Sequence, residues 1–246
     1  MSDDLLIRLL AWVEGWGVWL SWLAWATVFF GALAMLRATR GVRGRRIWLW
    51  AFVVTALAVV AHLADYWITL RRSPDLALEL NPLWRNVVTR YGLGWAKWYG
   101  LTGKLLVSVL AGQMTAFYLG NRARLFPRES AAGLPGFLRS MGERSAGWRE
   151  RAAALFTIFA FFFAGLTFFY FYIAYQNSIT DPKMLDLLPP TAVAVLAYVV
   201  LLVVAFVVMT YRAYRKWPVA SDQWSAPGGL PTTDHRPPTT ARGAGQ

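Results

Sequence analysis

The sequence contains no cysteine among its 246 residues. Disulfide bonds, thiolate metal ligands and a cysteine nucleophile are therefore excluded. Charged residues are also scarce, at 15% of the chain, whereas they make up about 25% of a typical soluble domain. Because 57% of the residues are hydrophobic, the composition excludes an ordinary soluble domain and predicts that much of the chain lies in lipid.

Acidic residues are few, with 13 Asp and Glu against 25 Lys and Arg, which gives a net charge of +12. The basic residues fall in the gaps between apolar runs, and no nucleic-acid-binding motif accompanies them. We therefore expect no nucleic-acid partner and attribute the charge to membrane topology. The sequence also lacks a catalytic Ser-His-Asp set, a phosphate-binding glycine loop and an internal repeat, and we expect no cofactor.

Five apolar segments are long enough to cross a hydrocarbon core of about 30 Å, which takes roughly 20 residues. They cover residues 9–36, 47–70, 93–119, 152–176 and 187–211. Lys97, Lys104 and Gln113 interrupt the third segment, but the charges of its flanking loops require a crossing there. The sequence therefore predicts an all-α fold, a polytopic transmembrane helix bundle with five spans in residues 1–217.

Positive charge predicts the orientation of the bundle, because cytoplasmic loops carry the excess of Lys and Arg. Residues 37–46 hold five arginines and no acid, and residues 120–151 hold seven arginines and three glutamates. The N-terminus is then outside and the C-terminus cytoplasmic, in a prokaryotic inner (plasma) membrane. The tail 218–246 has almost no apolar residues, which predicts a disordered cytoplasmic segment.

Ionisable groups inside a membrane cost roughly 2.5–3.5 kcal/mol each at the helix centre, so they are candidates for a functional site. Two neighbouring spans each carry a polar face. These faces consist of Thr55, His62, Asp65 and Thr69 on the second span and Lys97, Lys104, Ser108 and Thr115 on the third. An unpaired charge at this depth would tend to be neutralised. We therefore expect Asp65 to pair with Lys97, Lys104 or both.

The loop between these two spans is predicted to lie outside and to contain two short helices. Ser73-Pro74-Asp75 and Asn81-Pro82 each offer a capping residue followed by a proline suited to the first helical position. The second helix would have one apolar face, as interfacial helices do. Glu79 precedes that helix, so we expect it near the outer ends of both polar spans.

One pattern in this region resembles a known family. It consists of Asp65-x3-Thr69, Glu79-x-Asn81-Pro82-Leu83 and a lysine on the next apolar helix. It resembles a family of small prokaryotic integral membrane proteins known only as a domain of unknown function, over residues 58–112. The resemblance implies that these polar residues belong together, and it implies no activity. Lys97 fits the spacing of the family and Lys104 fits the apolar residues that follow, so both lysines stay open.

Three functions are compatible with the polar residues. The first is an outward-facing polar pocket for a small polar or ionic ligand, formed by His62, Asp65, Thr69, Glu79, Asn81, Lys97 and Lys104. The second is an intramembrane metal-dependent enzyme, since His62 lies one turn from Asp65 and could share a metal with it and Glu79. The third is an accessory or scaffolding subunit, or a homo-oligomer, whose polar faces pair with another chain in the lipid bilayer. A buried ion pair that only fixes helix register would explain the same residues without a ligand.

Overall fold

The computed structural model describes residues 3–77, 81–127, 133–141, 147–189 and 191–216. Within these ranges all regular structure is helical, which confirms the predicted all-α class. The helices are α1 (Asp3–Ala38), α2 (Arg45–Arg72), α3 (Pro82–Tyr91), α4 (Leu93–Asn121), the 3-10 helix η1 (Arg122–Leu125), α5 (Gly133–Ser140), α6 (Trp148–Leu166), α7 (Phe169–Ser178), α8 (Pro182–Asp186) and α9 (Thr191–Arg215). Glu79 and the tail 218–246 lie outside the described residues, so the predictions for them stay predictions.

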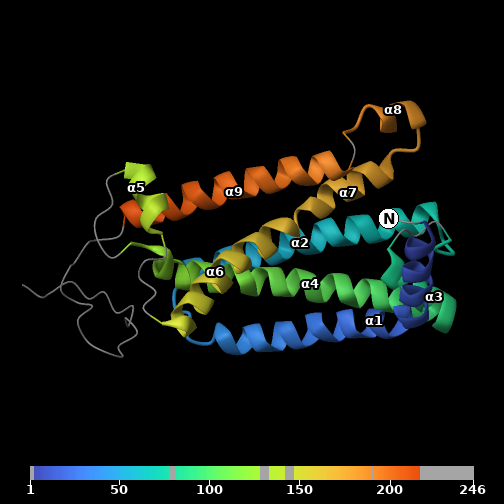
Figure 1. Ribbon diagram of the computed structural model, residues 1–246, viewed down its shortest axis with the longest axis horizontal. Coiled ribbons are helices and arrows are strands. Elements are labelled where there is room, and N and C mark those ends of the chain that lie inside the picture. The colour runs from blue at the N-terminus through green and yellow to red at the C-terminus, as the bar shows by residue number, and fades with distance from the viewer. Residues whose placement is uncertain (1–2, 78–80, 128–132, 142–146, 190, 217–246) are drawn as a thin grey trace, which may run out of the picture.

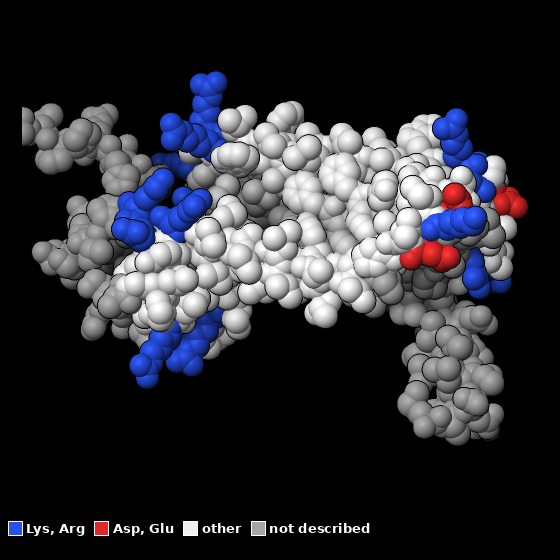
Figure 2. Space-filling model, turned by 90° about the horizontal axis from the view of Figure 1, so that it is seen from above, with Lys and Arg blue, Asp and Glu red and all other residues white. Residues whose placement is uncertain are grey.

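Four segments of the described chain are long and apolar enough to cross a membrane. They are Gly17–Ala38, Arg45–Arg72, Trp148–Ser178 and Val193–Arg215. These four helices mark a multi-pass membrane protein, and they overlap four of the five predicted spans. Figure 2 shows an uncharged belt between two charged ends, as expected for a protein that crosses a hydrocarbon layer. The predicted span 93–119 corresponds to α4, which is not among the four.

Helix α4 lies at the centre of the bundle, where it packs against α1, α2, α3 and α6 (Figure 1). Small residues let α2 and α4 approach closely. A Cβ atom added at Gly112 would overlap the hydroxyl of Thr55 and lie 2.7 Å from the carbonyl oxygen of Ala51. A helix that is largely surrounded by other helices needs few apolar side chains toward lipid. This position explains how α4 can hold Lys104 and Gln113 at partly or fully buried sites.

Helix α3 packs on α1 and α4 at one end of the bundle. It begins at Pro82, and the side-chain oxygen of Asn81 accepts the N–H of Leu83 at 3.0 Å, so the predicted cap is confirmed. Trp84 and Val87 are buried, in agreement with the predicted apolar face. The nitrogen of the Trp84 ring donates to the carbonyl oxygen of Ala96 at 2.5 Å, which anchors α3 to α4.

The helix predicted at Ser73 is wrong for the described residues 73–77, which form a turn. The carboxylate of Asp75 accepts the N–H of Ala77 at 3.1 Å and the hydroxyl of Ser73 at 3.0 Å. Leu76 has a φ of 60°, in the left-handed region, which stops helix propagation. The side chain of Asp75 thus closes a local loop in place of the predicted helix.

The predicted span 152–176 contains a break in its helix, so it consists of α6 and α7. The carbonyl oxygen of Gly165 accepts the N–H of Phe168 at 3.0 Å and the hydroxyl of Tyr198 at 2.8 Å. The hydroxyl of Thr167 donates to the carbonyl oxygen of Ala164 at 2.7 Å. After the break, α7 runs beside α2, whereas α9 stays at the edge of the bundle (Figure 1).

Candidate functional site

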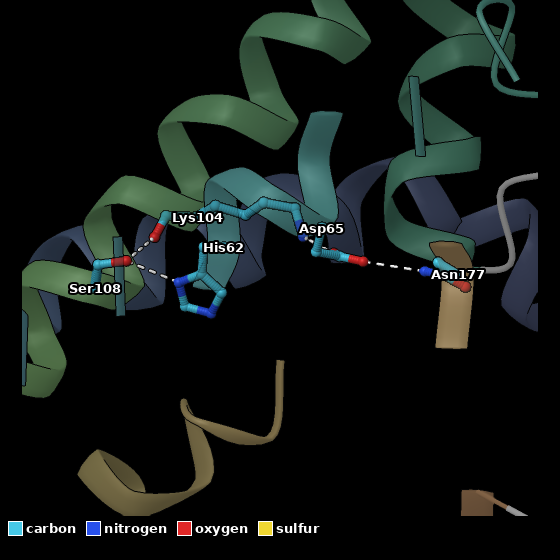
Figure 3. A network of polar contacts seen from close by, with 5 residues as sticks. All are labelled: His62, Asp65, Lys104, Ser108 and Asn177. Carbon is cyan, nitrogen blue, oxygen red and sulfur yellow. Dashed lines mark hydrogen bonds and ion pairs between the residues drawn. The ribbon is translucent and has the colours of Figure 1, made fainter. Parts of the chain in front are cut away.

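Three helices meet around a buried polar cluster (Figure 3). It contains His62 and Asp65 of α2, Lys104 and Ser108 of α4, and Asn177 of α7. His62 and Asp65 are three residues apart, and Lys104 and Ser108 are four apart, so each pair lies on one face of its helix. The polar faces of α2 and α4 are directed toward each other, and the end of α7 covers them from the side.

An ion pair forms the centre of the cluster. The ammonium nitrogen of Lys104 lies 2.5 Å from Oδ2 of Asp65, and the two side chains are 14% and 7% exposed. The side-chain amide of Asn177 donates to Oδ1 of Asp65 at 3.1 Å. Both carboxylate oxygens therefore accept bonds from protein donors, as a buried charge requires. The expected pairing of Asp65 with a lysine is confirmed, and the lysine is Lys104.

Two aromatic rings complete the surroundings of the Lys104 ammonium. Its nitrogen lies 4.8 Å from the ring centre of Tyr170 and 5.9 Å from that of Trp84. Such contacts attract a cation through the negative face of the ring. Trp84 is itself stacked on Tyr66, with ring centres 5.7 Å apart. The ammonium is thus enclosed by one carboxylate and two rings, each from a helix other than α4.

His62 and Ser108 form a second polar pair beside the first. Nδ1 of His62 lies 2.7 Å from the hydroxyl oxygen of Ser108, and that hydroxyl donates to the carbonyl oxygen of Lys104 at 2.8 Å. Because a serine hydroxyl has one proton, we assign the proton of this contact to Nδ1 of His62. The His62 side chain is 1% exposed and contacts the ring of Tyr170 edge to face, with ring centres 4.3 Å apart.

Of the seven predicted site residues, the structure brings His62, Asp65 and Lys104 together. The side chain of Asn81 caps α3, and the carbonyl oxygen of Thr69 accepts the N–H of Ser73 at 2.9 Å. Lys97 is half-buried, its carbonyl oxygen accepts the hydroxyl of Tyr66 at 3.2 Å, and it forms no ion pair with the described residues. The seventh, Glu79, lies outside the part of the chain that is described.

Two contributors were not predicted from the sequence, namely Tyr170 in the fourth predicted span and Asn177, one residue past its end. Asn177 is held in place because its carbonyl oxygen accepts a bond from Arg72 at 2.7 Å while its amide donates to Asp65. Tyr170 contacts both His62 and Lys104. The sequence signal for Asn177 is a pair of amides, Gln176 and Asn177, at the end of an apolar span, and Tyr170 belongs to an aromatic run typical of lipid-facing residues.

The metal hypothesis depends on Glu79 and stays a prediction. Among the described residues no group of three or more His, Asp or Glu side chains could hold a metal ion. In addition, Asp65 is bonded to Lys104 and Asn177, and Nδ1 of His62 is bonded to Ser108. A metal at Asp65 would have to compete with the bonds that its carboxylate makes to Lys104 and Asn177. The cluster of His62, Asp65, Lys104, Ser108 and Asn177 is chemically better suited to holding opposite charges and exchanging hydrogen bonds than to binding a metal ion.

Comparisons with protein-family models, curated proteins and solved structures give no match. The resemblance of residues 58–112 to a family of unknown function therefore stays a prediction. The functional assignment depends on the geometry of the cluster formed by α2, α4 and α7.

Proposed function

We propose that the protein is a five-span membrane protein that binds a small polar or ionic ligand at the Asp65–Lys104 pair. In this proposal α4 is the third crossing, the N-terminus is outside, the C-terminus is cytoplasmic, and the membrane is a prokaryotic inner membrane. The observation that carries the proposal is a buried ion pair between a carboxylate of α2 and an ammonium group of α4, which Asn177 and Tyr170 of α7 also contact.

The dimensions and surface of α4 support a fifth crossing. Its 29 residues extend about 43 Å at 1.5 Å per residue, enough to cross a hydrocarbon core. It runs alongside α1 and α2 (Figure 1). Where α4 is not covered by other helices it exposes Trp98, Leu105 and Val109, an apolar stripe suited to lipid. Of its two charged residues, Lys104 is directed into the bundle, where it pairs with Asp65.

A purely structural role explains the pair less well. Helices α2 and α4 already pack closely through Gly112 and Ala51, so no charge is needed to hold them together. Polar contacts between membrane helices average only about 0.6 kcal/mol, whereas burying a charge costs several times more. A pair that only fixed the register would also not need Asn177 and Tyr170 from α7. These extra groups support a site in which hydrogen bonds are exchanged with a ligand.

The depth of the pair supports access from the outside. Asp65 precedes the end of α2 at Arg72 by seven residues, which corresponds to about 10 Å. Asn177 is the penultimate residue of α7, at the same end of the bundle. A ligand that replaced the amide of Asn177 would reach the carboxylate without crossing the bundle.

The coverage of the polar faces favours a ligand site over a scaffolding subunit. A subunit that used these faces to bind another chain would present them at its surface. His62 and Asp65 are instead 1% and 5% exposed, and helices of the same chain cover them. This observation supports an internal site.

The test uses the full chain in lipid nanodiscs and measures its melting temperature. The probes are sodium, potassium and choline chloride, sodium phosphate and glycine. We expect at least one probe to raise the melting temperature of the wild type in a saturable way and to have no such effect on Asp65→Asn/Lys104→Met, which removes both charges. Lys97→Met is the matched control and keeps the response. The proposal fails if no probe stabilises the wild type or if the double variant responds equally.

A further inference from the structure

Basic residues from distant parts of the sequence gather at one end of the bundle. They come from segments 37–46, 122–124, 149–151 and 212–216, where α1, α4 and α9 end and where α2 and α6 begin. Figure 2 shows their blue side chains at one end of the face in view, with no red among them, whereas both colours occur at the opposite end. We call this set of residues the basic rim.

Little acidic charge balances the basic rim. Among its described residues the acidic one is Glu150, while the opposite end includes Asp75, Asp181 and Asp186. Most of the arginines are exposed, Arg43, Arg45 and Arg46 among them. Like charges this close repel each other unless counter-charges lie between them. The rim is therefore suited to an external anion.

Two of these arginines stand where helix formation disfavours them. Arg45 and Arg46 occupy the first turn of α2, which has no acidic residue and no side-chain cap. Positive charge at a helix N-terminus opposes the helix dipole and is unfavourable there. Their presence therefore does not serve the stability of α2 itself, and a bound anion at this position would offset the unfavourable charge.

Helix α5 places apolar side chains beside the basic end of α9. Phe137 is completely buried between Tyr211 and Tyr214 of α9, with ring centres 5.5 and 5.1 Å away, so α5 is fixed to the bundle. Leu134 and Leu138 are 38% and 44% exposed. A short amphipathic helix with exposed leucines next to arginines is typical of the boundary between headgroups and acyl chains.

We propose that the basic rim and α5 form a binding surface for anionic phospholipids of the membrane that the protein crosses. The arginines bind headgroup phosphates, which match the planar guanidinium in geometry and charge. Leu134 and Leu138 contact the first part of the acyl chains. This surface lies at the opposite end from the cluster around Asp65, and it does not depend on the ligand proposed there.

The test compares binding of fluorescent phosphatidylglycerol and phosphatidylcholine to the full chain in neutral detergent micelles. A basic residue near an anionic lipid surface contributes about 1 kcal/mol, or roughly fivefold in affinity. Arg43→Gln/Arg45→Gln/Arg46→Gln is therefore expected to weaken phosphatidylglycerol binding by about 10- to 100-fold. Binding of phosphatidylcholine should be weak and unchanged, and phosphatidylglycerol binding by the wild type should fall as salt rises.

The matched control is Arg71→Gln/Arg85→Gln/Arg90→Gln, which removes three exposed charges at the opposite end. It should bind phosphatidylglycerol within about twofold of the wild type, and both triple variants should melt near the wild-type temperature. The proposal is overturned if the two triple variants lose equal affinity or if the wild type binds both lipids equally. Equal or tighter binding of a single-stranded RNA, lost in the same variant, would overturn the lipid assignment in favour of nucleic acid.

Discussion

Breaking the Asp65–Lys104 pair from either side should destabilise the protein by about 3 kcal/mol, because each single change leaves a buried charge uncompensated. In Asp65→Asn the Lys104 ammonium loses its counter-charge and keeps an uncharged amide and the rings of Tyr170 and Trp84, at 4.8 and 5.9 Å. In Lys104→Met the carboxylate keeps only the amide of Asn177. The double variant removes both charges, so most of the loss should be recovered.

The assay is reversible unfolding of the four proteins in mixed micelles, arranged as a double-mutant cycle. We expect a coupling energy of at least about 2 kcal/mol between the two positions. Lys97→Met is the control, because Lys97 has no carboxylate partner among the described residues, and it should cost less than about 1 kcal/mol. Additive effects of the single changes, with coupling below about 0.5 kcal/mol, would refute the reasoning that the charges depend on each other.

Three further predictions concern other contacts. Asn177→Ala should raise the maleimide labelling rate of a Ser108→Cys variant about tenfold, since it removes a bond to a charged group worth roughly 1.5–3 kcal/mol. The native chain has no cysteine, so labelling reports this position alone. An unchanged labelling rate would contradict the covering role of α7. Gly112→Val should cost at least about 2 kcal/mol in unfolding free energy by overpacking, whereas Gly94→Ala, with open space around it, should be neutral or slightly stabilising. Hydrogen bonds from Ala77 and Ser73 hold the pKa of Asp75 below its usual value of 3.8. The turn at residues 73–77 should therefore be intact above pH 3.8 and loosen as the pH falls through the lowered pKa. An Asp75 carboxyl that titrates at its usual value in NMR spectra would contradict this prediction.

The helical class and most spans were predictable because lipid imposes a simple length and composition rule. The side chains at Asp65 and Lys104 were predictable as partners because a charge in an apolar layer needs a counter-charge. Sequence spacing could not choose between Lys97 and Lys104, since both lie on the same face of α4. Which lysine pairs with Asp65 depends on the relative axial position of α2 and α4. Contacts such as Gly112 against Ala51 fix that position.

The contribution of α7 was not predictable from the sequence. Residues 152–176 appear as one continuous apolar segment, so neither the break after Leu166 nor the contact of α7 with α2 could be expected. The carbonyl oxygen of Gly165, at the break, accepts a bond from Tyr198 of α9, a helix that is separate in the sequence. The turn at Ser73 was missed for a local reason, because the side chain of Asp75 competes for the backbone N–H groups that a helix would use.

The break at Gly165 has a mechanical consequence for α7. Backbone groups freed by a break are costly in hydrocarbon, but here the hydroxyls of Tyr198 and Thr167 bond two of the carbonyls on the α6 side. A movement of α7 away from α2 would therefore leave α6 intact. Among the described residues, the polar bonds that oppose this movement are those of Asn177. Its side-chain amide bonds Asp65, and its carbonyl oxygen accepts a bond from Arg72. The residue that covers the charges therefore also holds α7 against α2.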